Sequence, residues 1–163
     1  MPITVERDDA GRRFYAVATG DLTRTDILTL ISQHRVGAFR EYAIVFDAST
    51  ATSLPSSGDI DALVSHIASL AAREGVRGPV AIVGTGAIYG VARMYEIKCD
   101  LAGIDTIRAF QSVSDAEEWL ARAQFPFLTG RERPDIWWAT NCRQALTKCY
   151  DQYVPEGLPP ASP

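Results

Sequence analysis

The sequence has few cysteines and histidines, and it has no excess of positive charge. Three of its 163 residues are cysteine, two are histidine, and the formal net charge is −4. An odd number of cysteines without close pairs does not predict a disulfide framework. A protein that binds the phosphate backbone of nucleic acid usually presents a basic face, and none is evident here. We therefore expect neither a disulfide scaffold nor a nucleic-acid partner.

Long apolar runs are also missing. No stretch approaches the roughly 20 apolar residues needed to cross a bilayer. Residues 1–9 lack the basic region followed by an apolar run that is typical of a signal peptide. Hydrophobic residues make up 47% of the chain and charged residues 22%, which is usual for a folded domain. We expect a cytoplasmic protein with reduced cysteines.

Apolar periodicity predicts strands that alternate with helices. Residues 3–7 and 14–18 alternate apolar and polar and predict an opening hairpin. Short apolar runs at 43–46, 80–83 and 106–110 are typical of buried strands. Helical spacing predicts helices at about 23–36, 56–74, 86–102 and 114–122, and residues 49–58 are expected to form a loop. This order predicts an α/β domain with a mostly parallel, mixed five-stranded sheet and flanking helices.

Three of the predicted helices begin with a capping-box pattern. In this motif the side chains of two residues three apart each satisfy a free backbone amide at a helix start. The three pairs are Thr23 with Asp26, Ser56 with Asp59, and Ser114 with Glu117. The helix starts are therefore among the better-marked features of the chain.

The alternation of strands and helices ends at Arg122. Residues 1–122 are expected to form the α/β domain, and residues 123–163 a linker, an amphipathic helix and a disordered tail. Apolar residues recur at helical spacing from Trp138 to Tyr153. Because Trp137 and Trp138 are costly to leave together in water, we expect this helix to pack on the main domain.

Several stretches of the chain resemble one known family. They are the run from Arg77 to Val83, the run from Tyr89 to Glu96, and the strand that ends at Phe110 with the helix that follows it, residues 116–120. These stretches resemble the SpoIIAA-like family, which is related to the STAS domains of sulfate transporters and anti-sigma-factor antagonists. The resemblance covers about residues 3–120. It implies a β/α superhelix with one mixed sheet.

The resemblance also leads to our first hypothesis about function. Some members of the family look like carriers of apolar small molecules or like membrane-associating modules. The hypothesis is therefore that the chain is a non-catalytic binding domain that carries or senses an apolar small molecule or a lipid. The other partner that we consider is a membrane surface. The ligand would lie between the sheet and the helix at 86–102, where apolar residues cover more of the helix than a core needs.

Three residues are candidates for polar contacts with such a ligand: Asp47, Tyr89 and Arg93. Family members commonly carry Asp at the position of Asp47. It also follows a buried strand at its carboxyl end, where α/β sheets place ligand groups. The alternative is that Asp47 caps the following turn, while Arg93 pairs with Glu96 or Asp100 on the helix surface.

A second hypothesis is a protein-interaction module of the anti-sigma-antagonist type, with phosphorylation as an optional means of regulation. Ser56, Ser57 and Gly58 resemble the loop that carries the phosphorylated serine in that family, and Ser57 would be the acceptor. A phosphate there would add about two negative charges at a helix start. The acidic residue that usually precedes the two serines is Pro55 here. The competing interpretation is that these serines only cap the helix.

No catalytic, nucleotide or metal site is evident in the sequence. His34 and His66 lie on or next to apolar helical stripes, which favours structural roles. Gly84 and Gly86 follow a strand, but the next glycine is Gly90, one position too late for the dinucleotide fingerprint. The Cys142 and Cys149 thiols lack further ligands for zinc. We expect no enzyme, no cofactor and no metal.

The helix at 86–102 carries two apolar stripes rather than one. Ile88, Val91, Ala92, Tyr95 and Cys99 share the side that we assign to the sheet, and a polar stripe holds Tyr89, Arg93, Glu96 and Asp100. The second apolar stripe consists of Gly90, Met94, Ile97 and Leu101. Leaving it in water would forfeit several kcal/mol of burial, at roughly 1.5–3 kcal/mol per large side chain. A second copy of the chain is our first expectation for its cover, in a homodimer, and the C-terminal helix is the second.

Overall fold

The computed structural model describes residues 2–34, 37–53, 55–75 and 77–123. The chain divides into two compact units, Met1–Phe125 and Pro126–Pro163. The second unit, with the predicted helix that contains Trp138, lies outside the described residues.

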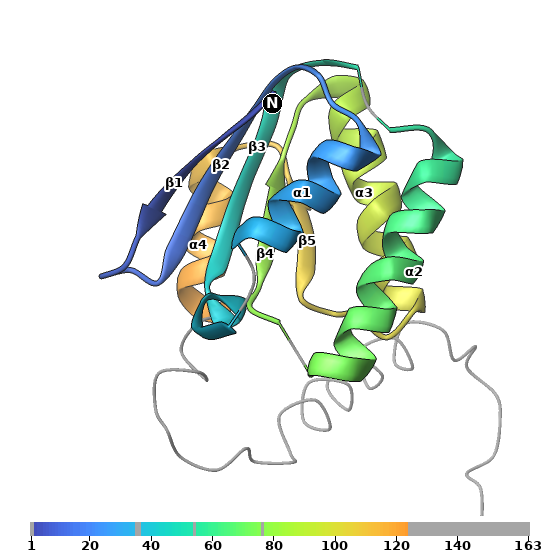
Figure 1. Cartoon of the computed structure of the whole chain (residues 1–163). Helices are drawn as coiled ribbons and strands as arrows, with labels where there is room; N and C mark the ends of the chain where they lie inside the picture. The colour runs from blue at the N-terminus through green and yellow to red at the C-terminus, as the bar shows by residue number, and fades with distance from the viewer. Residues whose placement is uncertain (1, 35–36, 54, 76, 124–163) are drawn as a thin grey trace, which may run out of the picture. The chain divides into compact units, whose positions relative to one another are not determined.

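Five strands form one mixed sheet in the order β1-β2-β3-β4-β5 (Figure 1). Strands β1 and β2 are an antiparallel hairpin, and all other neighbours in the sheet are parallel. The predicted α/β fold with a mostly parallel five-stranded sheet is thus confirmed. The strands are β1 (Ile3–Asp8), β2 (Arg13–Asp21), β3 (Ala43–Ser53), β4 (Val80–Val83) and β5 (Ile107–Phe110).

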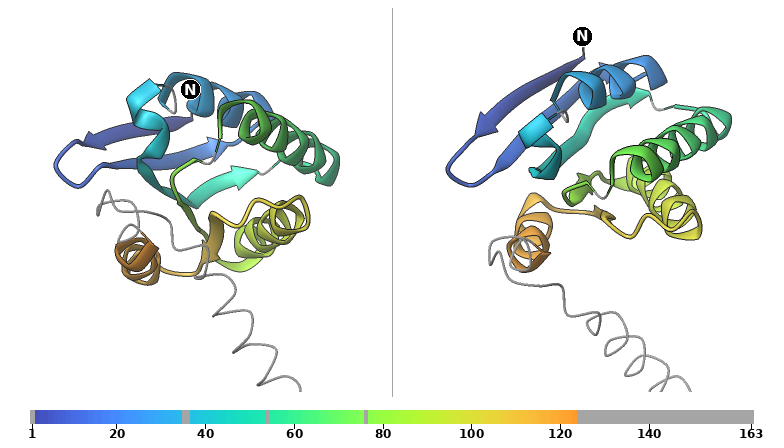
Figure 2. Two further views of the ribbon diagram at one scale, coloured as in Figure 1. Left: turned by 90° about the horizontal axis from the view of Figure 1, so that it is seen from below. Right: turned by 60° about the horizontal axis from the view of Figure 1, so that its bottom comes forward.

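The helices lie on both faces of the sheet (Figures 1 and 2). They are α1 (Arg24–His34), α2 (Ser57–Glu74), α3 (Gly86–Leu101) and α4 (Val113–Ala123), with a short 3-10 helix, η1 (Gly37–Glu41), between α1 and β3. The larger apolar core lies between the sheet and helices α1, α2 and α3. A smaller core lies on the other face, where Ala116 and Leu120 of α4 pack against Val45 and Val83.

Strand β3 is much longer than the sequence predicts. The expected loop at 49–58 begins only after Ser53, because β2 also continues to Asp21 and offers a partner for the extra residues. Thr50 pairs with Thr19, and its hydroxyl donates to the carbonyl oxygen of Ala18 at 2.9 Å. The added residues are mostly polar, and from Ala48 onward they lie beyond the end of β4, where Thr50, Thr52 and Ser53 are exposed.

The capping boxes are confirmed at two of the three predicted positions. At α2 the Ser56 hydroxyl accepts a hydrogen bond from the backbone N–H of Asp59, and the Asp59 carboxylate reaches back to Ser56. These hydrogen bonds from Ser56 lower the pKa of Asp59. The box at Thr23 and Asp26 forms in the same way. The third prediction was wrong: Ser112 and Asp115 cap α4, two residues earlier than expected.

Candidate functional site

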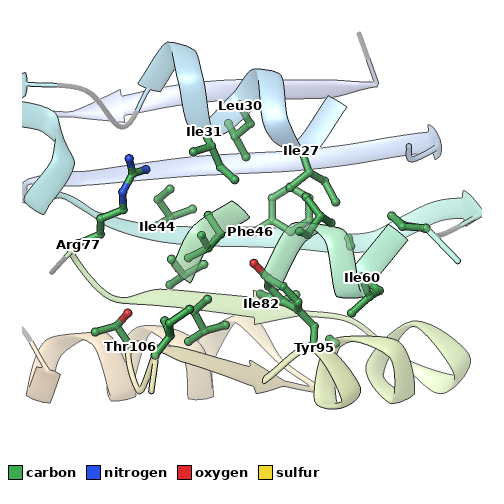
Figure 3. A pocket seen from close by; sticks show the side chains of 18 of the residues that line it. Ile27, Leu30, Ile31, Ile44, Phe46, Ile60, Arg77, Ile82, Tyr95 and Thr106 are labelled. Carbon is green, nitrogen blue, oxygen red and sulfur yellow. The ribbon is translucent and has the colours of Figure 1, made fainter. Parts of the chain in front are cut away.

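An apolar cavity of about 160 Å³ lies between the sheet and helices α1, α2 and α3 (Figure 3). Its floor is the sheet face that bears Ile44, Phe46 and Ile82. The remaining walls come from all three helices and from the segments that precede β4 and β5. This is the space between the sheet and α3 in which the sequence predicts a ligand.

The elements around the cavity are arranged by ordinary amphipathic periodicity. Side chains alternate between the faces of a strand, so Ile44, Phe46 and Ala48 share the cavity face of β3. The apolar stripe predicted for α3 contributes Ile88, Val91, Ala92 and Tyr95. Helix α2 packs on α1 and α3, and its residues Ile60, Leu63 and Ile67 line the cavity.

One basic side chain lines the cavity among its apolar neighbours. Arg77 is only 7% exposed, and it lies at one end of the cavity, on the same side as Thr106, while Ile60 and Tyr95 lie toward the other end (Figure 3). Its Nη2 donates to Glu74 Oε2 at 2.8 Å. The Nε and Nη1 atoms are buried and have no hydrogen-bond partner among the described residues.

The backbone around Arg77 explains why this side chain is held there. A Cβ atom at the next residue, Gly78, would lie 2.2 Å from the carbonyl oxygen of Glu41, so only glycine allows this close approach. The Gly78 N–H donates to the carbonyl oxygen of Arg40 at 3.0 Å. The Pro79 carbonyl then accepts from the N–H of Ile44 at 2.9 Å, which joins the segment to β3. Arg77 is therefore anchored directly before β4.

Two further polar wall residues lie close to Arg77 in the topology. Asp105 and Thr106 precede β5, as Arg77 precedes β4, and the Val80 N–H donates to the carbonyl oxygen of Thr106 at 2.8 Å. Asp105 is exposed and Thr106 is half-buried. The polar end of the cavity thus lies at the amino ends of the parallel strands.

The predicted ligand residues do not line this cavity. Asp47 is aligned with Val83 of the core beneath α4, so it lies on the opposite face of the sheet, and it accepts a hydrogen bond from the N–H of Ser49 at 2.9 Å. Arg93 pairs with Glu96 at 2.5 Å on α3, and this contact raises its pKa. Tyr89 is half-buried against the larger core. The structure does not bring these three side chains together, and Asp47 and Arg93 make the contacts of the alternative interpretation.

The first apolar stripe of α3 faces inward as predicted, but the other two stripes differ from expectation. Glu96, which we assigned to the polar stripe, is only 4% exposed, and it accepts a hydrogen bond from the backbone N–H of Ala109 at 2.9 Å. Met94 packs against the larger core. Gly90 is exposed, as are Ile97 (49%) and Leu101 (84%). The surface available to a partner is therefore narrower than the predicted interface, and Met94 is not part of it.

The structure also shows the surroundings of the serine, histidine, cysteine and glycine residues that the sequence singles out. Ser57 is exposed at the first position of α2. His34 packs edge-on against Phe14, with 5.6 Å between the ring centroids, whereas His66 is exposed rather than partly buried.

Cys99 is fully buried, and burial raises the pKa of its thiol to about 11. Gly86 has a φ of +55°, as a tight turn between β4 and α3 requires.

Two further observations concern the part of the chain that the structure describes. No group of three or more His, Cys, Asp or Glu side chains in that part is placed to hold a metal ion. No helix within it combines the length and the apolar character needed to cross a membrane.

The chain matches no protein-family model, and no curated protein matches it in sequence. Among solved structures it is similar to an uncharacterized protein of the DUF3478 family from Shewanella loihica PV-4, which is described as having a SpoIIAA-like fold. The TM-score is 0.47 and the sequence identity is 20%, over 72% of this chain and 91% of that chain.

Sequence reasoning missed two functional candidates, Arg77 and Glu96. In the sequence, Arg77 is singled out only by the family resemblance, and it stands directly before Gly78, Pro79 and a buried strand. Glu96 sits among polar residues at helical spacing, and the sequence contains no signal that a strand edge needs an acceptor there.

Proposed function

We propose that this domain binds an apolar small molecule in the cavity between the sheet and α1, α2 and α3, as a carrier or sensor that does not transform it. The observation that carries the proposal is the open space of about 160 Å³ within walls that are almost entirely apolar. Protein interiors are close-packed and rarely contain voids larger than a water molecule. A pocket of this kind with a few polar groups is the usual form of a small-molecule site.

The size and lining of the cavity restrict the ligand class. An engineered protein cavity of about 150 Å³ lined by Leu, Ile and Phe stays dry and binds benzene. The ligand here is therefore expected to bury an apolar body of about that size, such as a single ring or a short alkyl chain.

Titration with octan-1-ol tests the proposal without assuming any head group. We expect saturable binding of one molecule per chain by isothermal titration calorimetry, and shifts in the amide NMR signals of residues around the cavity. Native mass spectrometry of the purified protein should also reveal copurified apolar molecules. An absence of saturable binding of both octan-1-ol and a small aromatic such as toluene would contradict the proposal.

A second candidate function is the phosphoregulated interaction module. The specific observation in its favour is that Ser56 supplies the helix cap, so the neighbouring Ser57 hydroxyl is exposed and is not used by the capping box. A phosphate on Ser57 would lie at the start of α2, where the helix dipole favours negative charge. Phosphopeptide mapping of the protein isolated from its own cells tests this candidate, and an unmodified Ser57 under all growth conditions would count against it.

A further inference from the structure

We propose that the cavity selects apolar molecules that carry a carboxylate, and that Arg77 binds this carboxylate. The inference rests on the proposed binding function and adds the chemical class of the ligand. The cavity would take an apolar monocarboxylate, either a short-chain fatty acid or an aromatic acid. The charged group would lie beside Arg77 and the apolar body among the isoleucine and leucine side chains.

The first argument is the incomplete hydrogen bonding of a buried cation. A guanidinium group has five N–H donors and cannot lose its charge inside a protein. Arg77 is 7% exposed, yet its only described acceptor is Glu74, while Nε and Nη1 lack partners among the described residues. Buried polar groups are nearly always hydrogen-bonded, so each exception calls for an explanation. Both atoms are buried in this structure, so the guanidinium group would turn toward the cavity for a ligand acceptor to supply the missing partners.

The second argument is the position of that cation. Arg77 lies at one end of the cavity and the apolar walls extend away from it toward Ile60 and Tyr95 (Figure 3). An amphiphilic acid fits this distribution, because its charged and apolar ends are separated in the same way. A ligand with an acceptor would pair the Arg77 donors, whereas a ligand without one would gain no hydrogen bond there.

The third argument concerns the charge of the ligand. Glu74 already neutralises Arg77, but its side chain is 41% exposed and can turn into solvent when another carboxylate replaces it. A bound monocarboxylate would then take the place of the Glu74 carboxylate, so the net charge beside the guanidinium group would not change. A dianionic phosphate would place an additional charge in an apolar space, where an uncompensated charge is costly. The geometry therefore favours a carboxylate.

Octanoate and octan-1-ol are matched probes for the experiment, because they have the same chain length and differ at the head group. Calorimetric titration of the full chain should show octanoate binding at least tenfold more tightly than octan-1-ol. In Arg77→Met, which keeps an apolar stem, this preference should disappear. In Arg73→Met, a matched control at an exposed position of α2 outside the cavity walls, the preference should remain.

Glu74→Gln provides an independent test at a side chain that is 41% exposed, and its amide oxygen can still accept from Arg77. It removes the competing carboxylate, so octanoate should bind several-fold more tightly while octan-1-ol is unaffected. If Arg77→Met does not fold, as judged by circular dichroism, Glu74→Gln decides the question, and an unchanged affinity for octanoate overturns the inference.

The possible results separate this inference from the proposed function. Equal affinity of the wild-type protein for octanoate and octan-1-ol would overturn the role of Arg77 and leave apolar binding intact. An octanoate preference that persists in a folded Arg77→Met variant would do the same. No saturable binding of either probe would overturn both. Phenylpropanoate, titrated in parallel, distinguishes an aromatic acid from a linear one.

Discussion

The carboxylate of Glu96 on α3 accepts a hydrogen bond from the backbone N–H of Ala109 on β5, with 2.9 Å between Oε2 and the nitrogen. Strand β5 is the last strand of the sheet, so beyond it there is no neighbouring strand in the described sheet to accept from its outer amides. The other carboxylate oxygen of Glu96 pairs with Arg93 at 2.5 Å. A buried helix side chain thus satisfies a donor at the edge of the sheet and attaches α3 to β5.

We expect Glu96→Ala to lower the free energy of unfolding by about 1–3 kcal/mol, because it leaves a buried backbone donor without a partner. Glu96→Gln retains an acceptor oxygen and should have a smaller effect. Urea unfolding followed by circular dichroism measures both. Glu118→Ala, which breaks the exposed pair with Arg122, is the control and should change stability by less than about 1 kcal/mol. If Glu96→Ala lowers the free energy of unfolding no more than Glu118→Ala does, Glu96 does not stabilise the edge of the sheet.

The Cys99 thiol is expected to make stability fall as the pH rises above the ordinary thiol pKa. Its pKa in the folded protein is raised to about 11 by burial, so between the unfolded value and 11 only the unfolded chain releases the proton. Unfolding therefore becomes more favourable through this window, and the contribution is fully present at lower pH. In thermal unfolding from pH 8 to 11, the melting temperature should fall less steeply with pH in Cys99→Ala than in the wild-type protein. Equal slopes would mean that Cys99 does not contribute.

The same burial predicts slow chemical modification of Cys99. Iodoacetamide at pH 8 should modify Cys99 much more slowly in the native protein than in urea, as followed by peptide mass mapping of that cysteine alone. The reactive species is the thiolate, and it is scarce when the pKa is high and the sulfur is enclosed. Equal rates in the two conditions would show that this part of α3 opens readily.

Filling the cavity should abolish binding without unfolding the protein. Ala92 is 6% exposed and lies on the cavity wall of α3, so Ala92→Leu would occupy space that a ligand needs. Cavity filling commonly adds about 0.5–2 kcal/mol of stability where the larger side chain fits. We expect octan-1-ol binding to be lost in calorimetry while the melting temperature is kept or raised. Ala72→Leu on the exposed side of α2 is the matched control and should bind normally. Undiminished binding to Ala92→Leu would place the site elsewhere.

The homodimer predicted from the sequence can be tested at the two most exposed apolar residues of α3. Ile97 and Leu101 are 49% and 84% exposed, so their substitution by Asp should leave the core intact. We expect light scattering to show a dimer for the wild-type protein and a monomer for Ile97→Asp with Leu101→Asp, with native secondary structure retained by circular dichroism. Met94 is unsuitable for this test because it packs against the core. A wild-type protein that is monomeric at high concentration would exclude the dimer.

Local patterns in the sequence determine much of the fold. The capping residues of α1 and α2 can be predicted because each capping hydrogen bond joins residues only three apart in sequence. The pairs are Thr23 with Asp26 and Ser56 with Asp59. Strand β4 has the bounds that its apolar run predicts, since a strand that is buried on both faces needs an uninterrupted apolar sequence. The inward stripe of α3 follows from helical periodicity alone. These features depend only on neighbours in sequence.

Only the tertiary structure decided the features that depend on distant residues. Strand β3 extends to Ser53 because β2 lies beside it, and Glu96 is buried because the edge of β5 offers a donor. The position of Arg77 depends on Gly78 meeting the backbone of Glu41, and the cavity depends on how α2 rests on α1 and α3. The sequence by itself therefore determined the α/β fold and the inward face of α3, because those follow from local periodicity. The cavity and its buried cation required the assembled fold, because unfilled space and unpaired donors arise only when segments far apart in the chain meet.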